Sequence, residues 1–144
     1  MKNIDKEFVP YQEALALKEL GFDESCLGFY EFGSMDKEWH LRTKHISKNE
    51  YDDDDVIYVL KAPTYSQAFR FFRENYGLKH DIDDDNVGTK FYYKIRSYTD
   101  KFDNYDDIIK PMREERDWSK IEFYSYEETE LACLKKLIEI VKNN

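Results

Sequence analysis

The chain has 144 residues, of which 41% are hydrophobic and 17% are aromatic, and its formal net charge is −9. This length fits one compact domain, and the aromatic content argues against intrinsic disorder, which is poor in aromatic residues. The negative charge disfavours unspecific binding to DNA, RNA or anionic membranes, and it permits binding to a basic partner.

No apolar run approaches the about 18 residues that a membrane-spanning helix needs. The N-terminal stretch MKNIDKEFVPY lacks the apolar core of a signal peptide. The two cysteines, Cys26 and Cys133, have neither zinc-ligand nor redox spacing, and Cys133 falls in an apolar helical stripe, where a buried free thiol is expected. We therefore expect a cytoplasmic protein without membrane association.

The stretch FVPYQEALALKELGF predicts a first helix whose two ends are both marked. Pro10 suits the first turn of a helix, and Gly21 suits the left-handed backbone that often follows the last turn. Strands are expected next at 26–32 and 38–46, because the second segment alternates between two faces and a turn at Gly33 separates the two. They are predicted to pair as a β-hairpin.

The segment 56–62 is a continuous apolar run and predicts a central strand. The stretch PTYSQAFRFFRENYG then predicts a helix in which Thr64 and Gln67 have the spacing of a capping box and Gly77 follows the last turn. The aspartate-rich residues 80–88 are expected to form a polar loop.

Residues 89–98 predict a strand, with Phe91, Tyr93 and Ile95 on one face. The charged segment 99–119 is expected to hold only a short helix that stops near Pro111. A last strand is predicted at 120–125. The last helix has a capping-box pair at Ser125 and Glu128 and an apolar stripe formed by Leu131, Leu134, Leu137, Ile138 and Val141.

The predicted order is helix, hairpin, strand, helix, strand, strand and helix, without internal repeats or a linker. This order favours the α+β class and a single domain over residues 1–144. The simplest architecture is a mainly antiparallel sheet of about five strands with three helices packed on one face.

Two aspartate-rich runs stand out, YDDDDV at 51–56 and HDIDDDNVG at 80–88. An EF-hand calcium loop that started at Asp81 would have acids at its first, third and fifth positions. Asn86 replaces the usual glycine, however, and Tyr92 stands where a bidentate glutamate is needed. We therefore expect no structural calcium site in these runs.

Three interpretations of the runs stay open: solvated loops, a surface that imitates nucleic-acid phosphates, and a metal-dependent catalytic site. Adjacent aspartates on an extended backbone point to opposite sides, so at most two of the first run converge. A catalytic metal site would need further acids from elsewhere in the chain. The candidate partner-binding acids are Asp52, Asp53, Asp54, Asp55, Asp83, Asp84 and Asp85.

The other face of the strand at 89–98 combines stacking and cationic groups. Tyr92, Lys94 and Arg96 share this face, which in principle suits single-stranded nucleic acid. The aromatic signature of RNA-recognition sheets is missing, and Glu122 is expected to pair with Lys94. An exposed face held by cross-strand pairs is therefore favoured, and the three residues join the candidate partner-binding set.

No catalytic constellation is visible in the sequence. His40 and His45 are predicted on opposite strand faces, so they do not chelate one metal, and His80 stands apart from both. Neither a nucleophile motif nor a glycine-rich phosphate loop occurs. We expect no catalytic residues, no metal and no cofactor.

Three stretches, FVPYQEALALKELGFDES, KAPTYSQAFRFFRENYGL and YSYEETELACLKKLIEIVK, carry a resemblance. They resemble a family of small uncharacterised proteins from bacteriophages and from phage-derived regions of gut-type bacterial genomes. The likeness lies in helix caps and core stripes, and it is weakest across 34–55 and 98–119, so no functional residue is carried over. It implies an accessory phage protein in the cytoplasm of a bacterial host.

The leading hypothesis is a small acidic protein that binds a basic host protein, such as a guided nuclease of host defence, and no duplex nucleic acid or membrane. One alternative is a small metal-dependent enzyme that uses the clustered aspartates. Another is a structural or homo-oligomeric phage component, in which surface tyrosines would lie at the interfaces.

Overall fold

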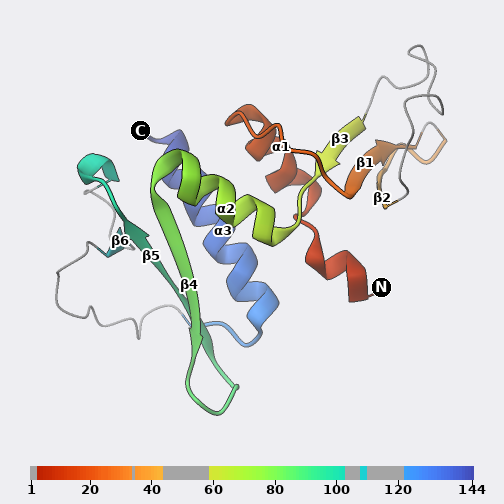
Figure 1. Ribbon diagram of the computed structural model, residues 1–144. Coiled ribbons are helices and arrows are strands. Elements are labelled where there is room, and N and C mark those ends of the chain that lie inside the picture. The colour runs from red at the N-terminus through yellow and green to blue at the C-terminus, as the bar shows by residue number, and fades with distance from the viewer. Residues whose placement is uncertain (1–2, 34, 44–58, 103–107, 110–121) are drawn as a thin grey trace. The chain divides into compact units, whose positions relative to one another are not determined.

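A computed structural model describes residues 3–33, 35–43, 59–102, 108–109 and 122–144 (Figure 1). The chain divides into two compact units, Met1–Gln67 and Ala68–Asn144, and each unit is described separately. The division falls inside the second α-helix, α2 (Tyr65–Tyr76).

The described part of the first unit contains two short helices, one antiparallel sheet and the first residues of α2. Its elements are η1 (Asn3–Glu7), α1 (Tyr11–Glu19), β1 (Gly28–Phe32), β2 (Trp39–Arg42) and β3 (Val59–Ala62). The strand order is β2-β1-β3, so β1 is central and pairs with β2 in the predicted hairpin. Residues 44–46 and 56–58 of the predicted strands lie outside the described residues.

The core of the first unit joins α1 to this sheet. Leu17 of α1 and Leu60 of β3 are buried, and α1 packs against β3. The Tyr30 hydroxyl of β1 donates a hydrogen bond of 2.6 Å to the Val9 carbonyl, which satisfies its polar end inside the core. Buried aromatic side chains therefore supply much of this core, as the composition predicts.

The predicted ends of the first two α-helices are confirmed. Gly21 has φ of +102° and Gly77 has φ of +66°, the left-handed backbone that glycine adopts without steric cost. The capping box that begins α2 is reciprocal: the Thr64 amide donates to Gln67 Oε1 at 3.0 Å, and the Gln67 amide donates to Thr64 Oγ1 at 3.2 Å.

The second unit places a helix over a three-stranded sheet of order β4-β5-β6. Its elements are the rest of α2, β4 (Leu78–Asp84), β5 (Phe91–Ser97), η2 (Asp100–Phe102), β6 (Ile108–Ile109) and α3 (Tyr126–Lys142). β4 and β5 form an antiparallel hairpin, and β6 runs parallel to β5. Figure 1 shows this hairpin as the long green pair of strands, and α3 packs on both β4 and β5.

The last helix buries most of its predicted stripe. The Glu128 amide donates to the Ser125 side chain at 3.1 Å, so the predicted N-cap is confirmed. Leu131 is only half-buried, whereas Ile140 and the free thiol of Cys133 are fully buried. The buried residues are Thr129, Cys133, Leu134, Leu137, Ile138, Ile140 and Val141.

Two segments differ from the prediction. The polar loop expected at 80–88 is wrong, because β4 continues to Asp84 and only the turn that follows is loop. Apolar and charged side chains alternate along β4, as in a strand with one buried face, but its many acids made the segment resemble a polar loop in the sequence. Ile108 and Ile109 form a strand rather than a short helix, since these β-branched residues pair with the buried part of β5.

The predicted strand at 120–125 is reduced to one bridge, in which Phe123 pairs with Phe91, and residues 120–121 lie outside the described part.

The α+β class and the mainly antiparallel pairing are confirmed. The described strands belong to two sheets, whereas one sheet was predicted, because the unrecognised β4 pairs with β5 inside the second unit. The single domain over residues 1–144 stays a prediction. Within the described part of the chain, no helix is both long and apolar enough to cross a membrane.

Candidate functional site

The outer face of the β4–β5 hairpin carries the predicted residues Tyr92, Lys94 and Arg96. The register places Lys94 opposite Asp81, and Asp83 opposite Tyr92. Asp81 lies between two cations, with Arg96 Nε 3.5 Å from its Oδ2 and Lys79 Nζ 3.9 Å from its Oδ1.

Lys94 Nζ lies 5.6 Å from the centre of the Tyr92 ring, within cation–π range. This side chain was expected to pair with Glu122, but Glu122 instead forms an ion pair of 3.2 Å with Lys90. Phe123 bridges to Phe91, which brings the preceding Glu122 beside Lys90 at the start of β5. The cations of this face are thus engaged within the sheet, which weakens the nucleic-acid interpretation.

The aspartates 83–85 lie where the hairpin turns. Asp85 accepts hydrogen bonds from the Val87 amide at 3.3 Å, from the Thr89 amide at 3.1 Å and from the Thr89 hydroxyl. The Thr89 hydroxyl is the largest cause that lowers the pKa of Asp85 to about 2. Asp84 accepts from the Asn86 amide at 2.8 Å, and Asn86 has the left-handed φ of +69°. These acids therefore shape the turn while their charges stay at the surface.

The segment that leads into α3 lies against the start of β5. Phe91 and Phe123 exchange two backbone hydrogen bonds, each of 2.8 Å, and the rings of Phe91 and Tyr126 meet edge to face at 6.2 Å. Glu122 raises the pKa of Lys90 most, and Tyr124 and Asp85 raise it further, so this ammonium has neighbours from both the turn and the α3 segment.

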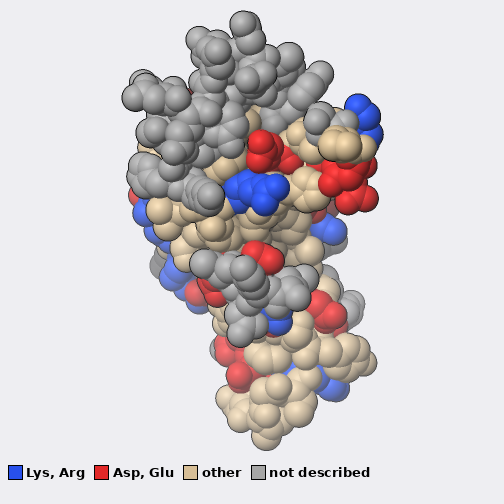
Figure 2. Space-filling view, turned by 90° about the vertical axis from the view of Figure 1, so that its right-hand side faces the viewer, with Lys and Arg blue, Asp and Glu red and all other residues tan. Residues whose placement is uncertain are grey.

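Three large uncharged side chains are exposed in this region: Tyr124 is 82% exposed, Val87 75% and Tyr126 46%. We call the combined surface the hairpin end. Its members are Val87, Asp83, Asp84 and Asp85 of the turn and Glu122, Tyr124 and Tyr126 of the segment that bridges to β5. Glu127 and Glu128 are included because they follow Tyr126 in the first turn of α3. The hairpin turn is the lowest part of Figure 1, and Figure 2 shows mostly uncharged surface at the bottom, with both red acidic and blue basic atoms close by.

The hairpin end contains only part of the predicted partner-binding set. Asp83, Asp84 and Asp85 belong to it, whereas Asp52, Asp53, Asp54 and Asp55 lie outside the described residues, as does His45. The exposed tyrosines and the glutamates of the α3 segment were not predicted as site residues. Their only sequence signal is the acid-rich first turn of the last helix.

A second polar cluster, not predicted as a site, lies in the β1–β2 turn. One potential ligand atom from each of Asp36, Glu38 and His40 lies within 4.8 Å of the others. The two Asp36 oxygens are engaged, one by the Glu38 amide at 3.1 Å and one by His40 Nε2 at 2.5 Å. The Glu38 amide is the main cause that lowers the pKa of Asp36, followed by His40. A Cβ at Gly33 would collide with this carboxylate, so the cluster is explained by closure of the turn.

Comparisons of the chain with protein-family models, curated proteins and solved structures found no match.

Proposed function

We propose that the protein acts by binding a basic segment of another protein at the hairpin end. The observation that carries this proposal is the combination of six acids with three exposed uncharged side chains, on a surface where Lys90, the only lysine there among the described residues, is already paired with Glu122. Carboxylates attract arginine and lysine, and tyrosine rings hold the same cations through cation–π contacts. Arginine is the better fit, because it also stacks on aromatic faces.

That the partner is a host protein is part of this proposal, and it rests on the resemblance to phage proteins noted from the sequence alone. A nucleic-acid-binding protein offers the required chemistry, because the groove that holds phosphates is lined by arginine and lysine. Acids at the rim of such a contact act mainly through the rate of encounter, so association is expected to be fast and sensitive to salt.

The first experiment measures binding of a nine-residue arginine peptide by isothermal titration, at about 20 mM and about 300 mM salt, where screening differs strongly. In the test variant Asp83→Asn, Glu127→Gln and Glu128→Gln are combined, which leaves the turn-forming Asp85 intact. The matched control combines Glu7→Gln, Glu19→Gln and Glu74→Gln, three exposed acids outside the hairpin end. Both variants lose the same charge.

We expect the test variant to lose at least about tenfold in affinity at low salt, and the control to lose much less. Tyr124→Ala should weaken binding further, whereas the exposed Tyr98→Ala should not. Equal losses in both acid variants would show unspecific charge attraction and contradict the proposal. Capture from host lysate with the wild type and the test variant then identifies the partner. A stable homo-oligomer that binds no partner would support the structural alternative.

A further inference from the structure

The first unit contains a pocket between α1 and β3. Its volume is about 160 Å³. The floor is apolar, since the side chains of Ala14, Phe22 and Leu60 are 2%, 6% and 5% exposed. The full lining is Ala14, Lys18, Phe22, Asp23, Val59, Leu60 and Lys61. Two ammonium groups and one carboxylate thus stand over an apolar floor.

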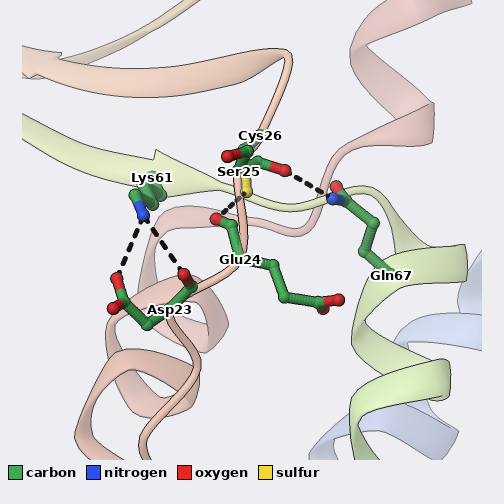
Figure 3. A network of polar contacts seen from close by, with 6 residues as sticks. All are labelled: Asp23, Glu24, Ser25, Cys26, Lys61 and Gln67. Atoms are coloured by element: carbon green, nitrogen blue, oxygen red, sulfur yellow. Dashed lines mark hydrogen bonds and ion pairs between the residues drawn. The ribbon is translucent and has the colours of Figure 1, made fainter.

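One side of the rim is fixed by a polar network (Figure 3). Lys61 Nζ from β3 lies 3.0 Å from Asp23 Oδ1 and 3.4 Å from the Asp23 carbonyl oxygen. Gln67 Nε2 donates to the Ser25 carbonyl at 2.8 Å, and Cys26 Sγ donates to the Glu24 carbonyl at 3.5 Å. These contacts hold the segment between α1 and β1 against β3 and the first turn of α2. They therefore fix the position of this side of the pocket rim.

The charges of the rim favour an anion. Asp23 is engaged by Lys61, so its carboxylate is compensated. Lys18 has no ion-pair partner among residues 3–33, 35–43 and 59–67, the described part of this unit. Asp23 compensates Lys61 in turn, so the uncompensated charge of the rim is that of Lys18. It would repel a cationic ligand, and a neutral ligand would leave it unused. An anion would gain a Coulomb attraction that acts at short range near a poorly solvated floor.

We propose that this pocket binds a small monocarboxylate. Its apolar end lies on Ala14, Phe22 and Leu60, and its carboxylate lies beside Lys18. A dry cavity of about 150 Å³ holds a benzene-sized molecule, so the ligand should have about six carbons in total. The site is separate from the hairpin end and does not depend on the proposed protein partner.

The test is an amide NMR titration of the full chain with three linear ligands of six carbons each: hexanoate, hexan-1-ol and hexan-1-amine. Hexanoate is expected to bind with a dissociation constant on the order of 1 mM, as suits a ligand of this size. Its shift changes should concentrate on α1, β3 and the segment between α1 and β1. The alcohol should bind several-fold more weakly and the amine more weakly still, and added salt should weaken hexanoate only.

Two variants assign the contacts. Lys18→Gln should weaken hexanoate about three- to tenfold and leave hexan-1-ol unchanged, since it removes one exposed charge. Lys142→Gln, at an exposed lysine of the other unit, is the matched control and should change neither. Ala14→Val should weaken both ligands by filling the floor. Because that change alters a buried helix position, its melting curve is measured alongside, and Lys18→Gln decides the proposal if Ala14→Val does not fold.

The proposal is overturned if hexanoate shows no saturation up to about 20 mM, well above the expected constant. It is equally overturned if the alcohol binds as tightly as the carboxylate, or if Lys142→Gln weakens hexanoate as much as Lys18→Gln does. Localised, saturable binding that prefers the carboxylate and depends on Lys18 supports it.

Discussion

The imidazole of His80 lies flat on the ring of Phe69, with ring centroids 3.6 Å apart and an angle of 11° between the planes. This contact joins β4 to α2 in the second unit. Burial is the main cause that lowers the pKa of His80 to about 4, and Arg73 and Lys79 lower it further, while Asp81 opposes them. The ring is therefore neutral near pH 7.

The stability of the protein should fall as the pH drops below about 6.5, the pKa of histidine in an unfolded chain. Between that value and about 4, the unfolded state binds a proton at His80 that the folded state does not, so acid favours unfolding. Urea unfolding at pH 7 and pH 5 should show a loss of about 1 kcal/mol, less than the full linkage value because the ring is partly exposed. His80→Phe keeps the stacking and removes the proton, so it should flatten this dependence. An unchanged slope would assign the effect to other groups.

Leu134 of α3 is fully buried, so substitutions that shorten or charge its side chain should strongly lower the free energy of unfolding. Leu134→Ala should lower the free energy of unfolding by about 2–5 kcal/mol through lost burial and a cavity. Leu134→Asp should leave the protein unfolded, because a buried unpaired charge costs several kcal/mol. The half-buried Leu131→Ala is the control and should cost clearly less. Circular dichroism with urea measures all three, and a stable Leu134→Asp protein would disprove the assigned packing.

The capping box of α2 gives a more local prediction. Thr64→Ala removes the acceptor of the Gln67 amide and should destabilise the protein by about 1 kcal/mol. Thr64→Ser keeps the hydroxyl, so it should retain most of that stability. Equal losses in the two variants would mean that the methyl group, rather than the hydrogen bond, is what matters at this position.

Calcium should not change the melting temperature. The oxygens of Asp85 accept hydrogen bonds from Val87 and Thr89. Among the described residues, the acids that match the EF-hand spacing do not bring their oxygens together as a group of potential metal ligands. Melting curves with about 1 mM calcium and with a chelator should agree within about 1 °C. A rise of several degrees with calcium would reveal a site that favours the folded state and would renew the case for a metal-dependent enzyme.

The helices could be predicted from the sequence because their signals are local. The Thr64 and Gln67 pair and Gly77 each lie within a few residues of the helix end that they mark. The two sheets could not be predicted, since pairing joins segments that are distant in sequence. β4 was missed because its outward charges resemble a loop, although Leu78, His80 and Ile82 alternate regularly toward the other face.

The hairpin end likewise contains some residues that could be recognised from the sequence and others that could not. Asp83, Asp84 and Asp85 are conspicuous in the sequence as a run of acids. Tyr124 and Tyr126 are not, because they join these acids only through the bridge between Phe91 and Phe123, a long-range pairing. The pocket also depends on long-range packing, since it needs α1 beside β3.

The same bridge has a consequence for the order of folding. The pair of Asp84 and Phe91 next to the hairpin turn is 7 residues apart (91 − 84), the β5–β6 pair of Ile95 and Ile108 is 13 apart (108 − 95), and Phe91 and Phe123 are 32 apart (123 − 91). Loop-closure entropy rises with this separation, so the earlier pairs bring the ends of the later loops together. The hairpin therefore forms first, and the pairing with β6 and then with Phe123 follows. The surface around Tyr124 is complete only at the last step, and it should be among the first parts to open when the unit is destabilised.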